Sequence, residues 1–146
     1  MSNASTYTED RTLDYWLKAN SATTSSPSTV YLALFAGSAD SAGHAAASVA
    51  NLEEGVLTDE VSASGTAYAR QSIAFGSISN GSVSNSGTVT YPTATGAGFG
   101  TVSHVAVMDA ASTGNILFYG ALTAEKLIAV GDTFQITATN LTISLA

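Results

Sequence analysis

The sequence has 146 residues, a net charge of −7, 10% charged residues and no cysteine. This length suits a single domain, the acidity disfavours a nucleic-acid partner, and the missing cysteines exclude disulfides, a thiolate nucleophile and a zinc–cysteine cluster. The start lacks the basic and apolar regions of a secretory signal, and no run approaches the roughly 18 apolar residues of a membrane span, so we expect a soluble protein made in the cytoplasm, with no membrane partner.

The first predicted element is a helix over residues 6–20, with Thr8 as the expected N-cap and acidic residues in the first turn. Leu13, Trp16 and Leu17 recur at the i, i+3, i+4 spacing and form one apolar stripe. We interpret this stripe as a docking or trimer contact, because tryptophan is enriched among interface anchors. The alternative, which the sequence leaves open, is that Trp16 covers the protein's own core.

After the helix the pattern is that of strands. Residues 29–37 are apolar on both faces, which predicts a buried central strand. Residues 38–64 have weak periodicity and are interpreted as a long loop with a short helical turn near 45–52. A further strand is expected over residues 66–75, and Asn80-Gly81 then predicts a hairpin.

The C-terminal third predicts two strands joined by a loop over residues 109–115, followed by a hairpin through Gly131-Asp132. In the last strand the apolar positions change parity between Ala138 and Leu141. Because a slip of one residue sends a side chain to the opposite face of a sheet, we expect a bulge or kink around Thr139-Asn140.

Many short strands separated by glycine and asparagine turns predict a mainly β fold. We expect an antiparallel β-sandwich or jelly-roll-like domain with one N-terminal α-helix. The period changes from helical to alternating across residues 21–28, a small polar stretch that contains Pro27. We therefore divide the chain into an N-terminal helix and linker arm, residues 1–28, and a β-sandwich domain, residues 29–146.

No group of side chains has the spacing of a catalytic, cofactor or metal site. His44 and His104 lie far apart and are interpreted as structural, and the acidic pairs 53–54 and 59–60 lack the calcium-loop pattern and are interpreted as a solvated loop. The GAGFG stretch at 96–100 lacks the dinucleotide-binding spacing and predicts a turn that lets a phenylalanine tuck inward. We expect no catalytic residue, no cofactor and no metal, and therefore no enzyme.

Arg70 is one of only four basic residues and lies within a predicted strand, on the same face as Tyr68. It could bind a ligand or anchor the strand through an ion pair. Arginine on a half-buried face usually meets a carboxylate with two parallel hydrogen bonds. Since no other polar partner is suggested for catalysis, we predict a structural ion pair between Arg70 and Asp109.

Three stretches together resemble a family of small structural proteins of tailed bacteriophages, labelled tail-fibre-like or virion proteins. They are GTAYARQSIAFG, VTYPTATGAGFGTVSHVAVMDAASTGNILFYGAL and VGDTFQITATNLTISL. The opening LDYWLKAN and STVYLALFAG are similar to the usual start of the family. The resemblance implies a non-enzymatic virion component and leaves its position in the particle open.

Within that family we expect a capsid decoration (cement) protein that stabilises the head, forms a homotrimer and docks on the major capsid protein or another virion protein. The alternative is a tail-fibre, neck or adaptor component of the virion. A further alternative is a carbohydrate-binding module, in which aromatic rings stack on sugars. The sequence disfavours it, because four of the tyrosines fall inside predicted strands, where they are expected to pack: Tyr31, Tyr68, Tyr91 and Tyr119.

Overall fold

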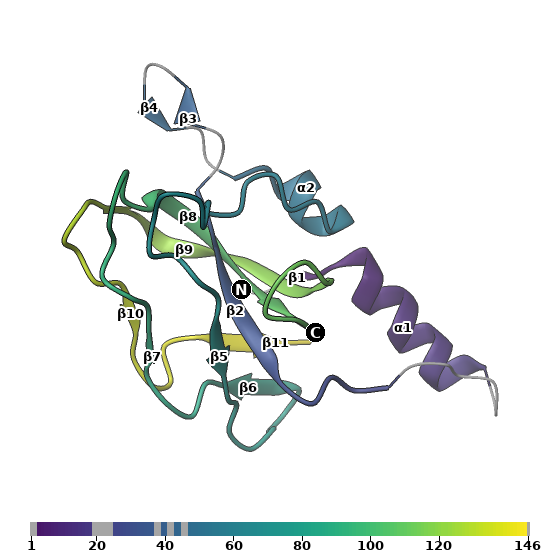
Figure 1. Ribbon diagram of the computed structural model, residues 1–146. Coiled ribbons are helices and arrows are strands. Elements are labelled where there is room, and N and C mark those ends of the chain that lie inside the picture. Colours follow the sequence, from purple (N-terminus) through teal and green to yellow (C-terminus); the bar gives the residue numbers. More distant parts are fainter. Residues whose placement is uncertain (1–2, 19–24, 37–38, 41–42, 45–46, 146) are drawn as a thin grey trace.

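The computed structural model describes residues 3–18, 25–36, 39–40, 43–44 and 47–145, and these residues are mainly β, with 37% in strands and 14% in helices. Five antiparallel strands form the main sheet, in the order β1-β9-β8-β2-β5 (Figure 1). The predicted fold class is therefore confirmed. The bounds of these strands are β1 Asn3–Ala4, β2 Val30–Phe35, β5 Gln71–Ile73, β8 Gly100–Met108 and β9 Ile116–Ile128.

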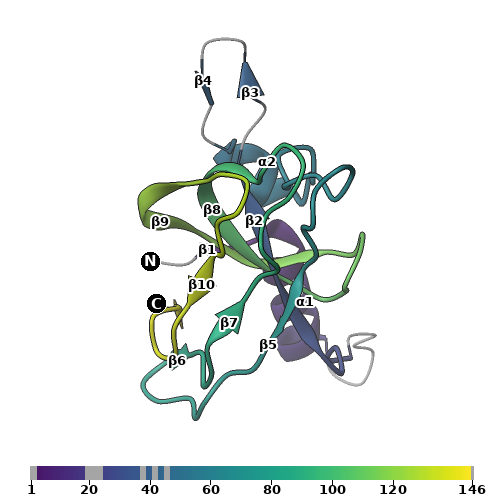
Figure 2. The same cartoon turned by 60° about the vertical axis from the view of Figure 1, so that its left-hand side comes forward.

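Smaller elements cover both faces of this sheet, in a sandwich-like arrangement (Figures 1 and 2). The pairs β6–β11 and β7–β10 lie on one face, while the helices α1 and α2 lie on the other; the pair β3–β4 extends from the end of the sheet. Their bounds are α1 Thr6–Leu17, β3 Ala39–Asp40, β4 Gly43–His44, α2 Val49–Glu54, β6 Ser82–Ser84, β7 Val89–Thr90, β10 Gln135–Ile136 and β11 Thr142–Ser144. Neither helix of the described residues is long and apolar enough to cross a membrane.

β2 is the buried central strand that its apolar sequence predicts. It pairs with β8 on one side and with β5 on the other. Leu32 and Leu34 belong to the core between the main sheet and the small strand pairs, whereas Ala33 and Phe35 belong to the core beside α2. Successive side chains of a strand point to opposite faces, so a strand covered on both sides has to be apolar at every position.

The turns follow the local sequence closely. Asn80 and Gly81 both have positive φ values, 51° and 71°, and Ser79 and Ser82 exchange two backbone hydrogen bonds, so the predicted two-residue hairpin is confirmed. The predicted loop 109–115 joins β8 to β9, as expected. Phe99 is buried within the glycine-rich turn, also as expected.

The hairpin predicted through Gly131-Asp132 is wrong in its pairing, although the turn exists. The Asp132 amide donates to the Ala129 carbonyl at 3.0 Å, but the following strand β10 crosses to β7 instead of returning along β9. The expected kink is confirmed, because the last predicted strand is divided into β10 and β11, and Thr139 between them has a φ of 68°.

The N-terminal helix begins at residue 6, as predicted, but its last helical residue is Leu17 and its cap differs from the predicted one. Its N-cap is Ser5, whose hydroxyl accepts from the Thr8 amide, so the expected cap at Thr8 is wrong. The Thr8 hydroxyl donates instead to the Leu117 carbonyl at 2.7 Å. Strand β1, just before the helix, pairs with β9, so the first residues of the proposed arm join the sheet.

Other expectations fall partly outside the described residues. These include positions 19–24, which hold the end of the predicted helix and most of the linker, and positions 37–38 at the end of the predicted central strand. The division into an arm and a domain at residue 28 therefore stays a prediction. The expected helical turn near 45–52 is found a little later, as α2, with Ser48 as its N-cap.

Candidate functional site

Arg70 is the centre of a buried polar cluster, and its partner is Glu60. Its Nε and Nη2 donate to the two oxygens of the Glu60 carboxylate, both at 2.7 Å. Its Nη1 donates to the carbonyls of Ala110 and Thr113, at 2.8 and 2.6 Å. The Tyr68 hydroxyl completes the cluster by donating to Glu60 at 2.9 Å.

The predicted pairing with Asp109 is wrong, although Arg70 does bind the loop that Asp109 begins. Asn115 donates a hydrogen bond to each carboxylate oxygen of Asp109: its backbone N–H binds one oxygen at 2.7 Å, and its side-chain Nδ2 binds the other at 2.8 Å. Asp109 therefore closes its own loop, and Arg70 reaches the carbonyls of that loop instead of the carboxylate.

The cluster has the properties of a structural ion pair. Burial of the guanidinium acts to lower the pKa of Arg70, but the hydrogen bonds and the charge of Glu60 outweigh it, so this pKa lies above its ordinary value. Burial and the nearby charge of Glu60 raise the pKa of the Tyr68 hydroxyl well above its usual range. Arg70 therefore stays charged and Tyr68 stays neutral at neutral pH, and both donate hydrogen bonds to the Glu60 carboxylate.

The acidic pair at residues 59–60 makes specific hydrogen bonds within the fold. Asp59 is buried, and its carboxylate accepts from the Ser48 amide at 2.9 Å and the Asn51 side chain at 3.4 Å, which fixes the start of α2. Glu60 is bound to Arg70, so the interpretation of residues 59–60 as part of a solvated loop is wrong. Among the described residues, no group of three or more histidine or acidic side chains could hold a metal ion.

His104 is half-buried, and its Nδ1 lies 2.9 Å from the Ser103 hydroxyl, which itself accepts from the Ala47 amide at 3.0 Å. The Ser103 hydroxyl has one proton and two acceptor lone pairs, so which side chain donates in this pair depends on the tautomer of His104. Burial lowers the pKa of His104, although the charge of Glu125 opposes this. The side chain of His44 lies outside the described residues.

We expect stability to fall on mild acidification because of His104. Its folded pKa is lowered, so the unfolded chain binds a proton more readily; the stabilisation is complete above about pH 6.5 and is lost as pH falls below it towards the folded pKa. Melting temperatures at about pH 7.5 and pH 5.5 test this. His104→Gln should show a smaller decrease than the wild type, and an equal decrease in both proteins would contradict the assignment.

The apolar side of α1 faces solvent. Leu13, Trp16 and Leu17, here called the outward stripe, are 56%, 76% and 74% exposed, whereas Tyr7 and Arg11 on the other side of the helix are half-buried. An ordinary surface helix has the opposite arrangement, with its apolar stripe against the core. The predicted interface residues are therefore available for contact, and Trp16 does not cover this chain's own core.

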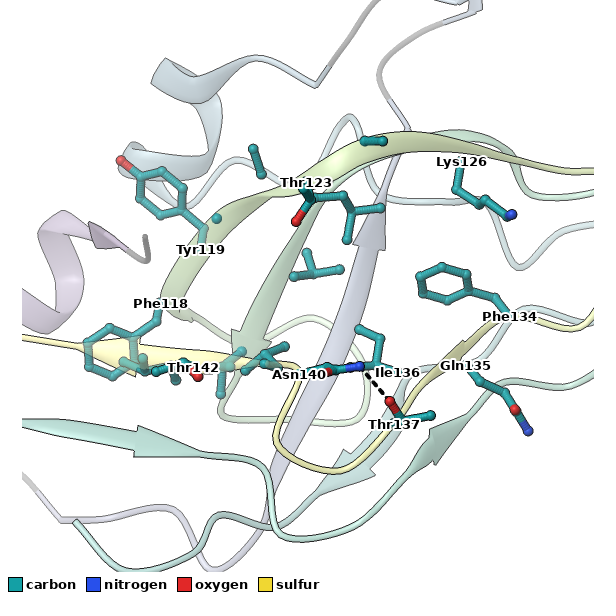
Figure 3. A pocket seen from close by; sticks show the side chains of 18 of the residues that line it. Phe118, Tyr119, Thr123, Lys126, Phe134, Gln135, Ile136, Thr137, Asn140 and Thr142 are labelled. Carbon is teal, nitrogen blue, oxygen red and sulfur yellow. Dashed lines mark hydrogen bonds between the residues drawn. The ribbon is translucent and has the colours of Figure 1, made fainter. Parts of the chain in front are cut away.

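A groove with both apolar and polar lining residues opens on the other side of the main sheet, between β9 and the segment 133–143 (Figure 3). Its volume is about 680 Å³. Polar side chains such as Thr123, Lys126 and Gln135 also line it, as Figure 3 shows. The sequence does not reveal this groove, because its apolar residues come from distant segments that each have an ordinary strand pattern.

The tyrosines considered for sugar stacking do not present their rings at the surface. Tyr68, Tyr91 and Tyr119 are buried, and Tyr31 is half-buried. The Tyr68 and Tyr91 rings stack on each other with centroids 6.1 Å apart, inside the core.

Comparison with known proteins gives one family. No curated protein matches the chain significantly. The model of the family described as "Podophage GP4 fiber I protein gp80" matches residues 3–144, which is nearly the whole chain and includes the Arg70 cluster, the outward stripe and the groove. The predicted resemblance to small structural proteins of tailed phages is thereby confirmed, and the chain belongs to the podophage GP4 fiber I protein gp80 family.

Proposed function

We propose that this protein is a non-enzymatic component of a phage fibre, present as a homotrimer whose subunits contact one another through the outward stripe of α1. Membership of a fibre-protein family supports a fibre over the capsid decoration expected from the sequence. Assembly through α1 is supported by the outward stripe, because its three large apolar side chains do not pack against the core of their own chain.

Leaving the outward stripe in water costs the protein free energy. Transfer of a large apolar side chain from water to a packed environment is worth about 1.5–3 kcal/mol, and tryptophan is among the residues most often found at the centre of interfaces. A fold that holds Leu13, Trp16 and Leu17 outward gives up this gain unless a partner covers them. A virion component, which is always assembled in its working state, has such a partner.

The composition fits the same role. Only 10% of the residues are charged, and most of the polar residues are neutral, namely serine, threonine and asparagine. These neutral groups cost less to desolvate than ionised ones, so subunits can pack closely without stripping water from many charges.

Purified virions test the position of the protein. We expect immunogold label at the tail, and a copy number far below that of the major capsid protein when the two bands are compared by densitometry. Label over the head, with a copy number similar to that of the major capsid protein, would instead identify a decoration protein and overturn the fibre assignment. A glycan array without hits would remove the carbohydrate-binding alternative.

A further inference from the structure

We propose that the groove of Figure 3 receives the outward stripe of α1 from a second copy of this chain. The inference rests on the proposed assembly through α1 and adds the surface that α1 binds. Subunits would then associate head to tail, each one giving its helix to one neighbour and its groove to another.

The groove exists because the two layers of the fold do not close along β9. The strands β10 and β11 pair with β7 and β6, and neither pairs with β9, so the layers stay separated at this edge. Five large apolar side chains line the opening and are only partly buried: Val105, Phe118, Leu122, Phe134 and Leu141.

The size of the groove suits the stripe. A cavity of about 150 Å³ holds a benzene ring, so a groove of about 680 Å³ has room for an indole ring together with leucine side chains. Its open edge also lacks a strand partner. β1 pairs with β9 at Phe118 and Tyr119 alone, so the outer edge of residues 120–128 meets no further strand within the described part of the chain. Proteins usually cover such an edge, and a second copy lying over the groove would do so.

A chain cannot fill its own groove with its own helix. The groove lies on the face of the main sheet that carries β10 and β11, and α1 lies on the opposite face (Figures 1 and 2). Contacts between two different surfaces of identical chains close into a ring when the rotation between subunits allows it, and a three-membered ring is the proposed homotrimer.

The charges are complementary. Lys126 is exposed at the groove, in a chain with only four basic residues. The outward stripe has Glu9 and Asp10 beside it, both exposed on the same helix. Such a pair of opposite charges at the rim of an apolar contact mainly steers association and fixes orientation.

Two variants and their mixture test the proposal by sedimentation velocity. The helix variant, Leu13→Ser with Leu17→Ser, removes both leucines of the outward stripe and leaves Trp16 in place as a fluorescent probe. The groove variant, Thr123→Arg, adds bulk and charge at an exposed position of the lining without removing a core side chain. The matched control, Thr95→Arg, places the same side chain at an exposed position outside the groove.

We expect the wild type and the control to form the same oligomer, and each variant alone to weaken it by roughly 30-fold or more in dissociation constant. An equal mixture of the two variants should form dimers and nothing larger, because one intact helix and one intact groove remain for each pair. Trp16 is the only tryptophan, so its emission should shift to the blue with assembly in the wild type and stay at the exposed position in the groove variant.

The two variants distinguish binding in the groove from assembly through α1. Dissociation of the helix variant with an intact oligomer in the groove variant would overturn the groove as the binding surface and leave assembly through α1 standing. Wild-type oligomers from both variants, or a wild type that stays monomeric at every concentration, would overturn both. Should Thr123→Arg fail to fold, Lys126→Glu replaces it, and unchanged assembly in that variant at low salt would count against the proposal.

Discussion

Replacement of Arg70 by leucine should lower the free energy of unfolding by about 3–5 kcal/mol, the usual cost of removing one partner from a buried ion pair. The substitution leaves the Glu60 carboxylate without its counter-charge, in a place where the Arg70 side chain is 3% exposed and the Glu60 side chain 15%. It also removes the donor shared by the Ala110 and Thr113 carbonyls, so the loop between β8 and β9 loses its attachment to the segment before β5. Urea unfolding followed by circular dichroism measures the loss.

Two further variants identify the cause. The double variant Arg70→Leu with Glu60→Leu should recover part of the stability, because no unpaired charge remains in the interior. Arg70→Lys keeps the charge but not the two parallel hydrogen bonds, and we expect an intermediate loss. A decrease below about 1 kcal/mol for Arg70→Leu would contradict the assignment, since pairs of that strength are found at solvated surfaces.

The second large effect is expected at Gly96, where another segment approaches closely. A Cβ atom built on Gly96 would lie 1.7 Å from the backbone carbonyl oxygen of Gly65, and Gly96 has a φ of +62°. Gly96→Ala should therefore lower the free energy of unfolding by roughly 2–5 kcal/mol, by adding the cost of overpacking to that of a left-handed backbone.

The chain offers two matched controls for this substitution. Gly131 has a φ of +90°, and a Cβ atom added there would meet nothing within 4 Å, so Gly131→Ala should show the backbone cost alone, about 1–2 kcal/mol. Gly87 has open space and no positive φ, so Gly87→Ala should be close to neutral. If thermal unfolding shows the same decrease in stability for Gly96→Ala and Gly131→Ala, the close approach of Gly65 adds nothing to the cost at Gly96, and the prediction is wrong.

The strands and turns of this fold are predictable because their causes are local. Asn80-Gly81 needs no distant contact to form a hairpin turn, and the apolar run of β2 indicates burial on both faces wherever its neighbours lie. Strand pairing is different. The alternation in residues 134–136 is equally compatible with β9 and with β7 as the neighbour, so the sequence indicates a strand and not its partner.

The same reason explains the error at Arg70. The burial of Arg70 and its need for a carboxylate follow from the residue type and its apolar surroundings. Glu60, however, belongs to a segment without hydrophobic periodicity, so the sequence does not indicate that this segment returns to the sheet beside Arg70. In the structure Glu60 forms an isolated bridge with Phe35, at the end of β2, and this bridge brings its carboxylate to Arg70. The groove is hidden for a related reason, because it depends on how far two layers separate.

The pairing of β1 with β9 also has a consequence for synthesis on the ribosome. The hydroxyls of Ser5 and Thr8 bind the carbonyls of Ile116 and Leu117, so the base of α1 is fixed by residues more than a hundred positions later. Contacts this distant in sequence form slowly, and here they cannot form until most of the chain has been translated. A nascent subunit therefore cannot hold its helix in place for a neighbour, and association is deferred until the polypeptide is nearly complete.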